Sequence, residues 1–294
     1  MQRALTLALA LSLTLAPGAV LSQPKLRVVA TSADLKSIAE AIGGARVEVE
    51  SLASPEHDPH VIDLKPAQLA RARSAVLLIR VGLDHEPWLA KLRLPPSVTI
   101  VDMSSRVRLI QTQTPRLRVE RRAHVHAFGN THYWLDPVNA IEIAAATRDA
   151  LAKLSPNDQQ LFDANYSAFG ALLKSKVESW MSALAPYRGT KIVVVHDSWS
   201  YFAERFGLSI VAAAEPTPGV PPSPAELAAL LQRMREGDVR IIVADPHSNP
   251  SLVRHIATQS GALVVTLAPS GDDYVRLIDA NVTKLVGAMK GIPR

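Results

Sequence analysis

Residues 155–186 read SPNDQQLFDANYSAFGALLKSKVESWMSALAP and form one unbroken helical pattern. Apolar side chains recur there at helical spacing: Leu161, Phe162, Tyr166, Phe169, Leu172, Leu173, Val177, Trp180, Met181 and Leu184. Ser155 and Pro156 suit the N-cap and the first turn, and Pro186 ends the pattern. A helix of roughly thirty residues is roughly 45 Å long. We therefore expect residues 155–187 to link the two halves of a two-domain protein.

Strand and helix patterns alternate on both sides of this segment. Expected strands are 26–30, 47–52, 75–79 and 98–101 before it, and 192–195, 209–213, 239–244 and 263–267 after it. Helical patterns fill the gaps: 33–42, 66–73, 86–92 and 137–154, then 199–206, 224–235, 250–260 and 273–289. This alternation predicts parallel βαβ units. The fold class is α/β, with lobes at 23–154 and 188–294 that each hold a mostly parallel four-stranded sheet.

The first 22 residues predict a secretory signal peptide. Arg3 supplies the positive charge, Ala4–Ala16 is an apolar run, and Val20 and Ser22 suit cleavage before Gln23. The run is too short to anchor the chain across a membrane. Because the chain contains no Cys, it has no site for a lipid anchor, and we expect a periplasmic protein rather than a lipoprotein.

Composition excludes several classes of site. With no Cys among 294 residues, disulfides, thiolate-bound zinc, iron–sulfur clusters and thiol catalysis are excluded. The formal charge of +5 is modest. Six arginines gather between 106 and 122 without interleaved aromatic residues, which indicates a surface loop rather than a nucleic-acid site. Residues 104–131 show no periodicity and are expected to form a long loop.

Common catalytic motifs are missing from the sequence. It contains no G-x-x-x-x-G-K-[ST], G-x-G-x-x-G, H-E-x-x-H or G-x-S-x-G. Three carboxylate pairs are interpreted as charged surface residues: Asp34/Glu40, Asp272/Asp273 and Glu215/Glu226. The four tryptophans are expected in the core rather than in a cofactor site.

Three of the nine histidines occupy loops where a ligand would bind. His60 follows the second strand, His196 follows the strand that ends at Val195, and His132 precedes the sequence Tyr-Trp-Leu-Asp-Pro. In parallel α/β domains, ligand groups gather beyond the carboxyl ends of strands. Imidazole is a good zinc ligand, so three such rings predict a metal site if they converge.

Several motifs occur in an order that resembles the metal-binding solute receptors of bacterial ABC transporters, the ZnuA/TroA-like family. They are Asp58-Pro-His60, Gly82-Leu-Asp-His-Glu-Pro-Trp-Leu89, His132-Tyr-Trp-Leu-Asp-Pro137, His196-Asp-Ser-Trp-Ser-Tyr-Phe-Ala203, Pro222-Ser-Pro-Ala-Glu-Leu227 and Asp273-Tyr-x(6)-Asn281. The likeness covers essentially the whole chain after residue 22, and it implies two α/β lobes bridged by a rigid helix.

The resemblance assigns roles to particular residues. His60, His132 and His196 match the three ligand positions, and a histidine at the third favours zinc over manganese. Relatives often carry Asp at a fourth position, where this chain has Ala268, so water or His126 is expected to complete the site. Asp245 is a weaker candidate, and His124 and His126 are expected to capture metal at lower affinity.

The resemblance also implies binding and delivery rather than catalysis. A monomeric receptor would pass zinc to a membrane permease whose cognate ATPase hydrolyses ATP, and it would meet the membrane only through that permease. Three alternatives stay open: a manganese or iron receptor of the same family, a surface adhesin, and a secreted zinc hydrolase with an open position for water.

Overall fold

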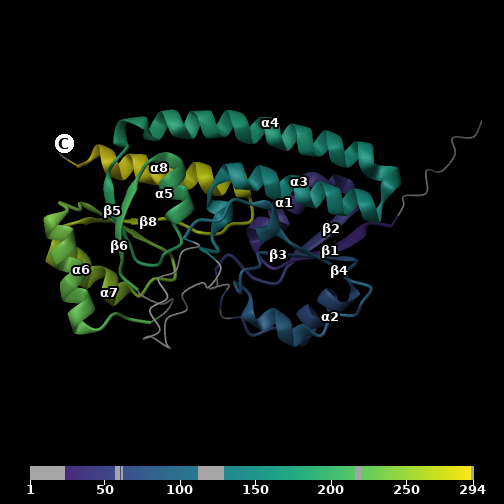
Figure 1. The fold of residues 1–294 in the computed structure, drawn as a ribbon, viewed down its shortest axis with the longest axis horizontal. Helices are drawn as coiled ribbons and strands as arrows, with labels where there is room; N and C mark the ends of the chain where they lie inside the picture. The colour runs from purple at the N-terminus through teal and green to yellow at the C-terminus, as the bar shows by residue number, and fades with distance from the viewer. Residues whose placement is uncertain (1–23, 57–59, 61, 112–128, 216–219, 293–294) are drawn as a thin grey trace, which may run out of the picture.

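The computed structural model describes residues 24–56, 60, 62–111, 129–215 and 220–292. The expected signal peptide (1–22) and the loop histidines His124 and His126 lie outside these residues. Two four-stranded parallel sheets lie side by side, each flanked by helices, and one long helix runs past both (Figure 1). The predicted α/β class, with two parallel sheets and a long helix, is confirmed.

The first sheet has the strand order β2-β1-β3-β4. Its strands are β1 (Leu26–Ala30), β2 (Val47–Ser51), β3 (Leu77–Arg80) and β4 (Thr99–Asp102). Helices α1 (Ala33–Gly43), α2 (Pro66–Ser74) and α3 (Pro137–Leu154) belong to this half. Val28 of β1 pairs with Val49 of β2 and Leu77 of β3, so β1 is central in the sheet.

The second sheet repeats this topology in the order β6-β5-β7-β8. Its strands are β5 (Lys191–Val194), β6 (Ser209–Ala213), β7 (Ile241–Ala244) and β8 (Leu263–Thr266). Its helices are α5 (Ser200–Phe206), α6 (Pro224–Glu236), α7 (Pro250–Ser260) and α8 (Tyr274–Lys290). In each sheet the strand order changes direction between two central strands, β1 and β3 in the first sheet and β5 and β7 in the second. Such a topological switch point leaves a crevice at the carboxyl ends of the strands.

Short 3₁₀ helices occupy several connections. They are η1 (Gly44–Arg46), η2 (Pro87–Leu92), η3 (Met103–Arg106), η4 (Tyr133–Leu135), η5 (Pro156–Asp158) and η6 (Ala185–Tyr187). The helix expected over 86–92 is thus a 3₁₀ helix, and the expected loop over 104–131 begins within η3. Residues 112–128 of that loop lie outside the described part of the chain.

The long helix α4 spans Gln159–Leu184, 26 residues and about 39 Å. It begins later than expected because Ser155 has φ −141° and ψ 79°, which interrupts the helical backbone, and residues 156–158 form η5 instead. α4 packs against α1 and α3 of the first half and against α8 of the second. Lys176 and Trp180 of α4 both donate hydrogen bonds to Asp279 of α8, at 2.7 and 2.6 Å.

One hydrophobic core runs through both halves. It joins the central strands of the two sheets to the inward face of α4, which includes Phe162, Leu173 and Leu184. At the flanks of that buried face, Leu161, Leu172 and Met181 are between 39% and 47% exposed. The four tryptophans are buried as expected: Trp88, Trp134, Trp180 and Trp199. Because the core is continuous, packing fixes the two sheets relative to each other.

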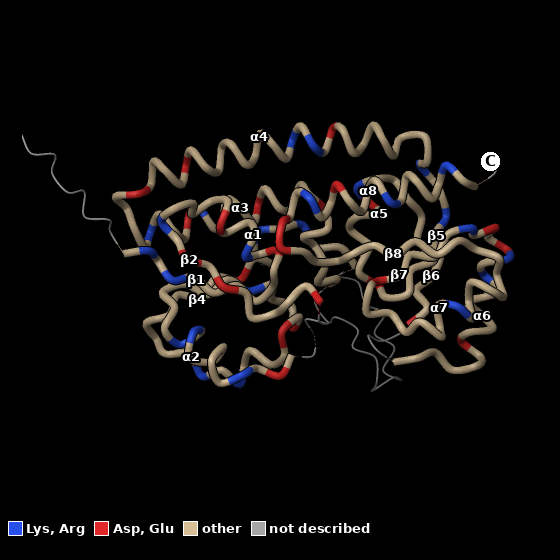
Figure 2. Tube along the Cα trace, turned by 180° about the vertical axis from the view of Figure 1, so that it is seen from behind, with Lys and Arg blue, Asp and Glu red and all other residues tan. Residues whose placement is uncertain are grey.

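The surface carries charges of both signs. Lys and Arg are interspersed with Asp and Glu over both halves of the described chain (Figure 2). No described helix combines the length and apolar composition that crossing a bilayer requires.

Candidate metal centre

The three predicted histidines reach the same place from different elements. His60 follows β2, His196 follows β5, and His132 immediately precedes η4 at the start of α3. His60 and His196 belong to different sheets, so their meeting shows that the carboxyl ends of both sheets face each other. The site therefore lies where the two halves meet.

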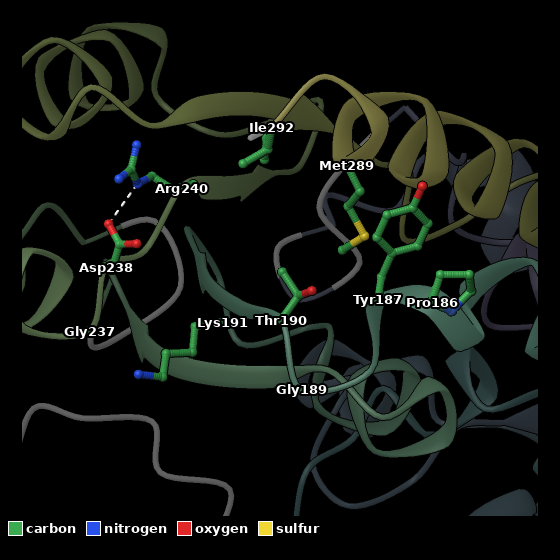
Figure 3. Close-up of a pocket in the computed structure, with 10 residues that line it drawn as sticks. All are labelled: Pro186, Tyr187, Gly189, Thr190, Lys191, Gly237, Asp238, Arg240, Met289 and Ile292. Carbon is green, nitrogen blue, oxygen red and sulfur yellow. Dashed lines mark hydrogen bonds and ion pairs between the residues drawn. The ribbon is translucent and has the colours of Figure 1, made fainter. Parts of the chain in front are cut away.

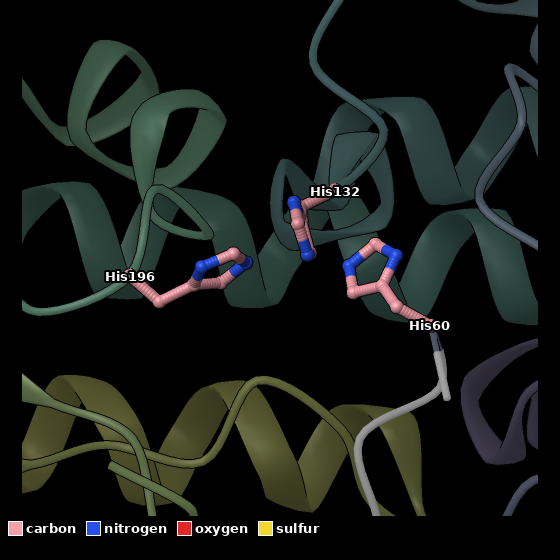
Figure 4. A group of neighbouring side chains, drawn as sticks. All are labelled: His60, His132 and His196. Carbon is pink, nitrogen blue, oxygen red and sulfur yellow. The ribbon is translucent and has the colours of Figure 1, made fainter. Parts of the chain in front are cut away.

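The three imidazoles form a close group. One nitrogen of each ring lies within 4.8 Å of the chosen nitrogens of the other two. Ring centres are 5.5 Å apart for His60 and His132, 5.9 Å for His60 and His196, and 5.2 Å for His132 and His196. Figure 4 shows the His132 ring between the other two, with ring nitrogens turned toward a common space. His132 is 3% exposed, whereas His60 and His196 are half-buried.

This donor set fits a zinc ion. Zinc binds imidazole nitrogen at about 2.0–2.1 Å in a tetrahedral arrangement, so the nitrogens bound to one ion lie roughly 3.3–3.4 Å apart. The chosen nitrogens of the three rings lie within 4.8 Å of one another, so binding an ion would draw them closer together. Neutral imidazole suits zinc, copper, iron and nickel, whereas magnesium, calcium and manganese prefer oxygen ligands.

Asn130 fixes the tautomer of His132. The side-chain oxygen of Asn130 accepts a hydrogen bond from the His132 backbone N–H at 3.0 Å and lies 3.2 Å from Nδ1 of the ring. An amide oxygen only accepts, so Nδ1 carries the proton and Nε2 of the neutral ring keeps its lone pair. Such a bond behind a ligand holds the ring in the orientation that binds metal.

Asn130 also ties His132 to the second half of the protein. Its side-chain nitrogen donates to the backbone carbonyl of Asp197 at 2.9 Å, directly after His196. The backbone carbonyl of Asn130 accepts from the Tyr201 hydroxyl of α5 at 3.0 Å. The segments that carry His132 and His196 are therefore held to each other by direct hydrogen bonds.

The loop after β8 has no metal-binding side chain at Ala268, the predicted fourth position. Ala268 has no donor side chain, and its backbone N–H and carbonyl are both bonded to the Asn281 amide, at 3.0 and 2.7 Å. The carbonyl of Pro269 accepts from Nε1 of Trp134 at 2.9 Å. Asp245 accepts from Nε1 of Trp199 at 2.7 Å and lies outside the close histidine group. His126 falls outside the described residues.

Asp34 corrects the interpretation of the carboxylate pairs, because it is fully buried rather than a surface residue. It lies in the first turn of α1 and accepts from the Ser270 hydroxyl at 2.5 Å and the Gly271 N–H at 3.2 Å. Burial raises the pKa of this carboxyl to about 7, and the nearby Asp272 adds to the rise. Asp34 thus fastens α1 to the loop after β8. Its expected partner Glu40 is exposed, as predicted.

Sequence reasoning gave no role to His85, which the structure places beside the group. Its ring centre lies 4.3 Å from that of His60 and 5.5 Å from that of His132. The signal was available in the sequence, because His85 follows the end of β3 as His196 follows β5. Sequence reasoning also missed Asn130. No sequence motif marks an amide that orients a neighbouring histidine.

A separate pocket of about 430 Å³ lies at the opposite, amino-terminal end of the second sheet. Figure 3 shows its lining, which includes Tyr187, Thr190, Lys191, Asp238, Arg240 and Met289. Arg240 and Asp238 in this pocket are exposed and form an ion pair with each other, at 2.6 Å. None of the clustered histidines lines this pocket.

Comparison with known proteins agrees with this architecture. Residues 28–288 match the family model described as zinc-uptake complex component A, periplasmic. The chain is 28% identical over 289 residues to the high-affinity zinc uptake system protein ZnuA of Yersinia pestis, covering 90% of this chain and 91% of that one. It is 23% identical to the zinc-binding lipoprotein AdcA of Streptococcus pneumoniae, covering 89% of this chain and 55% of AdcA.

A solved structure shares the fold over its whole length. The zinc-bound crystal structure of a ZnuA variant lacking residues 138–173 superposes with a TM-score of 0.79 at 26% identity, covering 92% of this chain and 100% of the other. The family model spans nearly the entire described chain. This protein therefore belongs to the family of periplasmic A components of zinc-uptake complexes.

Proposed function

We propose that this protein is a periplasmic zinc receptor that captures the ion at His60, His132 and His196 and delivers it to an ABC-type permease. The observation that carries the proposal is the meeting of three imidazoles within 4.8 Å at the boundary between the two sheets. Membership of a zinc-uptake family supports zinc as the ion, and so does the all-nitrogen donor set.

Each step of binding and delivery has a proposed place in this chain or in its partner. Neutral imidazoles hold the ion, Asn130 holds one of those imidazoles in its binding tautomer, and the boundary between the sheets limits contact with water. The ATPase belongs to the partner, because the chain has no phosphate-binding loop. The proposal includes export to the periplasm directed by residues 1–22, as their sequence predicts.

Native mass spectrometry with elemental analysis tests this proposal. The purified protein should carry one zinc, and the variants His60→Ala, His132→Ala and His196→Ala should each lose it. His255→Ala is the matched control, because His255 is exposed on α7 and should not affect the ion. Zinc retained in all three variants would overturn the site.

Metal competition on the metal-free protein separates the alternatives within the family. Zinc should displace manganese from the site, because imidazole nitrogen suits zinc and manganese prefers oxygen donors. Tighter binding of manganese or iron than of zinc would assign the receptor to that metal instead.

A further inference from the structure

The turn that carries His85 has an unusual backbone. Leu83 and Asp84 both have φ of 57°, in the left-handed region that residues with side chains rarely adopt. Such a backbone is strained and persists only where the surroundings impose it. Here Glu86 imposes it, because its carboxylate accepts from the N–H groups of Val81 and Gly82 at 2.6 and 3.0 Å.

The consequence of this turn is that His85 is directed into the protein. The residue is 0% exposed, and its ring lies edge-on to His60 at 4.3 Å between centres. Its distance from His132, 5.5 Å, is the same as that between His60 and His132. Four imidazoles therefore share one cluster, although only three have their nitrogens within 4.8 Å of one another.

His85 also has the supporting bond of a metal ligand. Its Nδ1 lies 2.9 Å from the hydroxyl of Thr131, which can accept a hydrogen bond from Nδ1–H. Asn130 holds Nδ1 of His132 in the same way. Two adjacent residues thus contact two imidazoles at Nδ1, so Nε2 is the nitrogen through which each ring would bind a metal.

The other nearby donors are engaged elsewhere. Asp245 accepts hydrogen bonds from Trp199 and Ser198, and Asp197 accepts from the Ser200 hydroxyl at 2.5 Å. Ala268 has no donor, and its loop is fixed by Asn281. Zinc in structural sites is almost always held by four ligands in a tetrahedron. Among the described residues, His85 is the imidazole placed to supply the fourth ligand.

We propose that His85 is the fourth ligand of the zinc centre, binding through Nε2 while Nδ1–H donates to Thr131. Ion binding draws Nε2 of His85 into the group formed by the other three histidines. The inference rests on the proposed function, since it concerns the same ion. It replaces water or His126 at the fourth position.

Nuclear magnetic resonance of ¹⁵N-histidine-labelled protein tests the assignment. After one equivalent of zinc is added, four histidines should show a ring nitrogen at the metal-bound chemical shift. His85→Gln should leave three, and its zinc affinity, measured against a chelator, should fall by more than about 10-fold, as the loss of even an orienting residue does. His255→Gln, the same change at an exposed site, should leave all four signals.

The outcomes separate this inference from the proposed function. Three zinc-bound histidines in the unaltered protein would overturn the role of His85 while leaving the receptor intact, and this count does not depend on any variant folding. A fourth signal lost in His126→Gln instead of His85→Gln would also overturn it. No zinc-bound histidine at all would reject the proposed function. His85→Asn repeats the test with a smaller side chain, and unfolding curves of the metal-free variants establish that they fold.

Discussion

The side-chain nitrogen of Asn130 lies 2.9 Å from the backbone carbonyl of Asp197, and this bond crosses the boundary between the two halves. Asn130 is two residues before His132, and Asp197 directly follows His196. The geometry of the histidine group therefore depends on an amide that is not one of its proposed ligands.

Replacing Asn130 should weaken zinc binding without removing a ligand. Asn130→Ala deletes the acceptor for Nδ1 of His132 and the bond to Asp197, so affinity should drop roughly 10- to 100-fold. Asn130→Asp keeps the acceptor and loses only the donor, so its loss should be smaller. Chelator competition measures both. Asn157→Ala, an exposed change in η5, is the control, and equal affinities for it and Asn130→Ala would contradict this role.

Zinc affinity should fall as the pH is lowered from about 8 to 5. Protons compete with zinc for imidazole nitrogen, whose ordinary pKa is near 6.5. Well below that value, each zinc that binds should displace about one proton from each ligating histidine, which is about four if His85 is a ligand and about three if it is not. Isothermal titration in buffers of different ionisation enthalpy would count them. A flat affinity profile would argue strongly against imidazole ligation.

Asp34 should make the metal-free protein less stable as the pH rises. The folded carboxyl holds its proton up to about pH 7, whereas the unfolded chain releases it near 3.8. Between these values the folded state binds more protons, so the free energy of unfolding falls with rising pH, on the order of a few kcal/mol in total. Asn in this position has no proton to lose and still reaches Ser270 and Gly271.

The stability difference between Asp34→Asn and the unaltered protein should therefore grow in favour of the variant from pH 5 to pH 8. Urea unfolding at each pH measures it. Asp63→Asn, an exposed change in the same half, should show no such trend. A difference for Asp34→Asn that stays constant with pH would mean that the carboxyl is not held protonated.

The ion pair between Arg205 and Asp136 should contribute to the joining of the halves. Two nitrogens of Arg205 on α5 donate to the two oxygens of Asp136, both at 2.7 Å, and Asp136 also caps α3. The Asp136 side chain is only 8% exposed. Arg205→Ala leaves this carboxylate without its cation, so stability should fall by about 1–3 kcal/mol.

Chemical denaturation of the metal-free protein measures that loss. Arg276→Ala provides the comparison, because Arg276 is 89% exposed in its pair with Asp273 and such pairs contribute little. If both variants lose the same small amount of unfolding free energy, the Arg205–Asp136 pair does not stabilise the contact between the two halves.

Local sequence signals determined most of the fold. Ser32 caps α1 by accepting from the Leu35 N–H, and Ser223 with Glu226 forms a capping box on α6. These caps involve residues only three positions apart, so the local sequence is enough to specify them. The alternation of strands and helices likewise required the parallel order seen in both sheets. The choice of His60, His132 and His196 followed from their places near strand ends, and their role as ligands stays a prediction until metal binding is measured.

Tertiary structure alone decided what depends on distant partners. Asp34 can be buried because its carboxyl group accepts hydrogen bonds from Ser270 and Gly271, which lie 236 and 237 positions away in the sequence. His85 joins the histidine cluster because Glu86 holds a strained turn against the end of β1. Propensity and capping act between neighbours along the chain, whereas burial and charge state depend on which surfaces pack together. The sequence by itself therefore determined the elements and three of the rings, and packing decided which carboxyl keeps its proton and which fourth imidazole stands beside them.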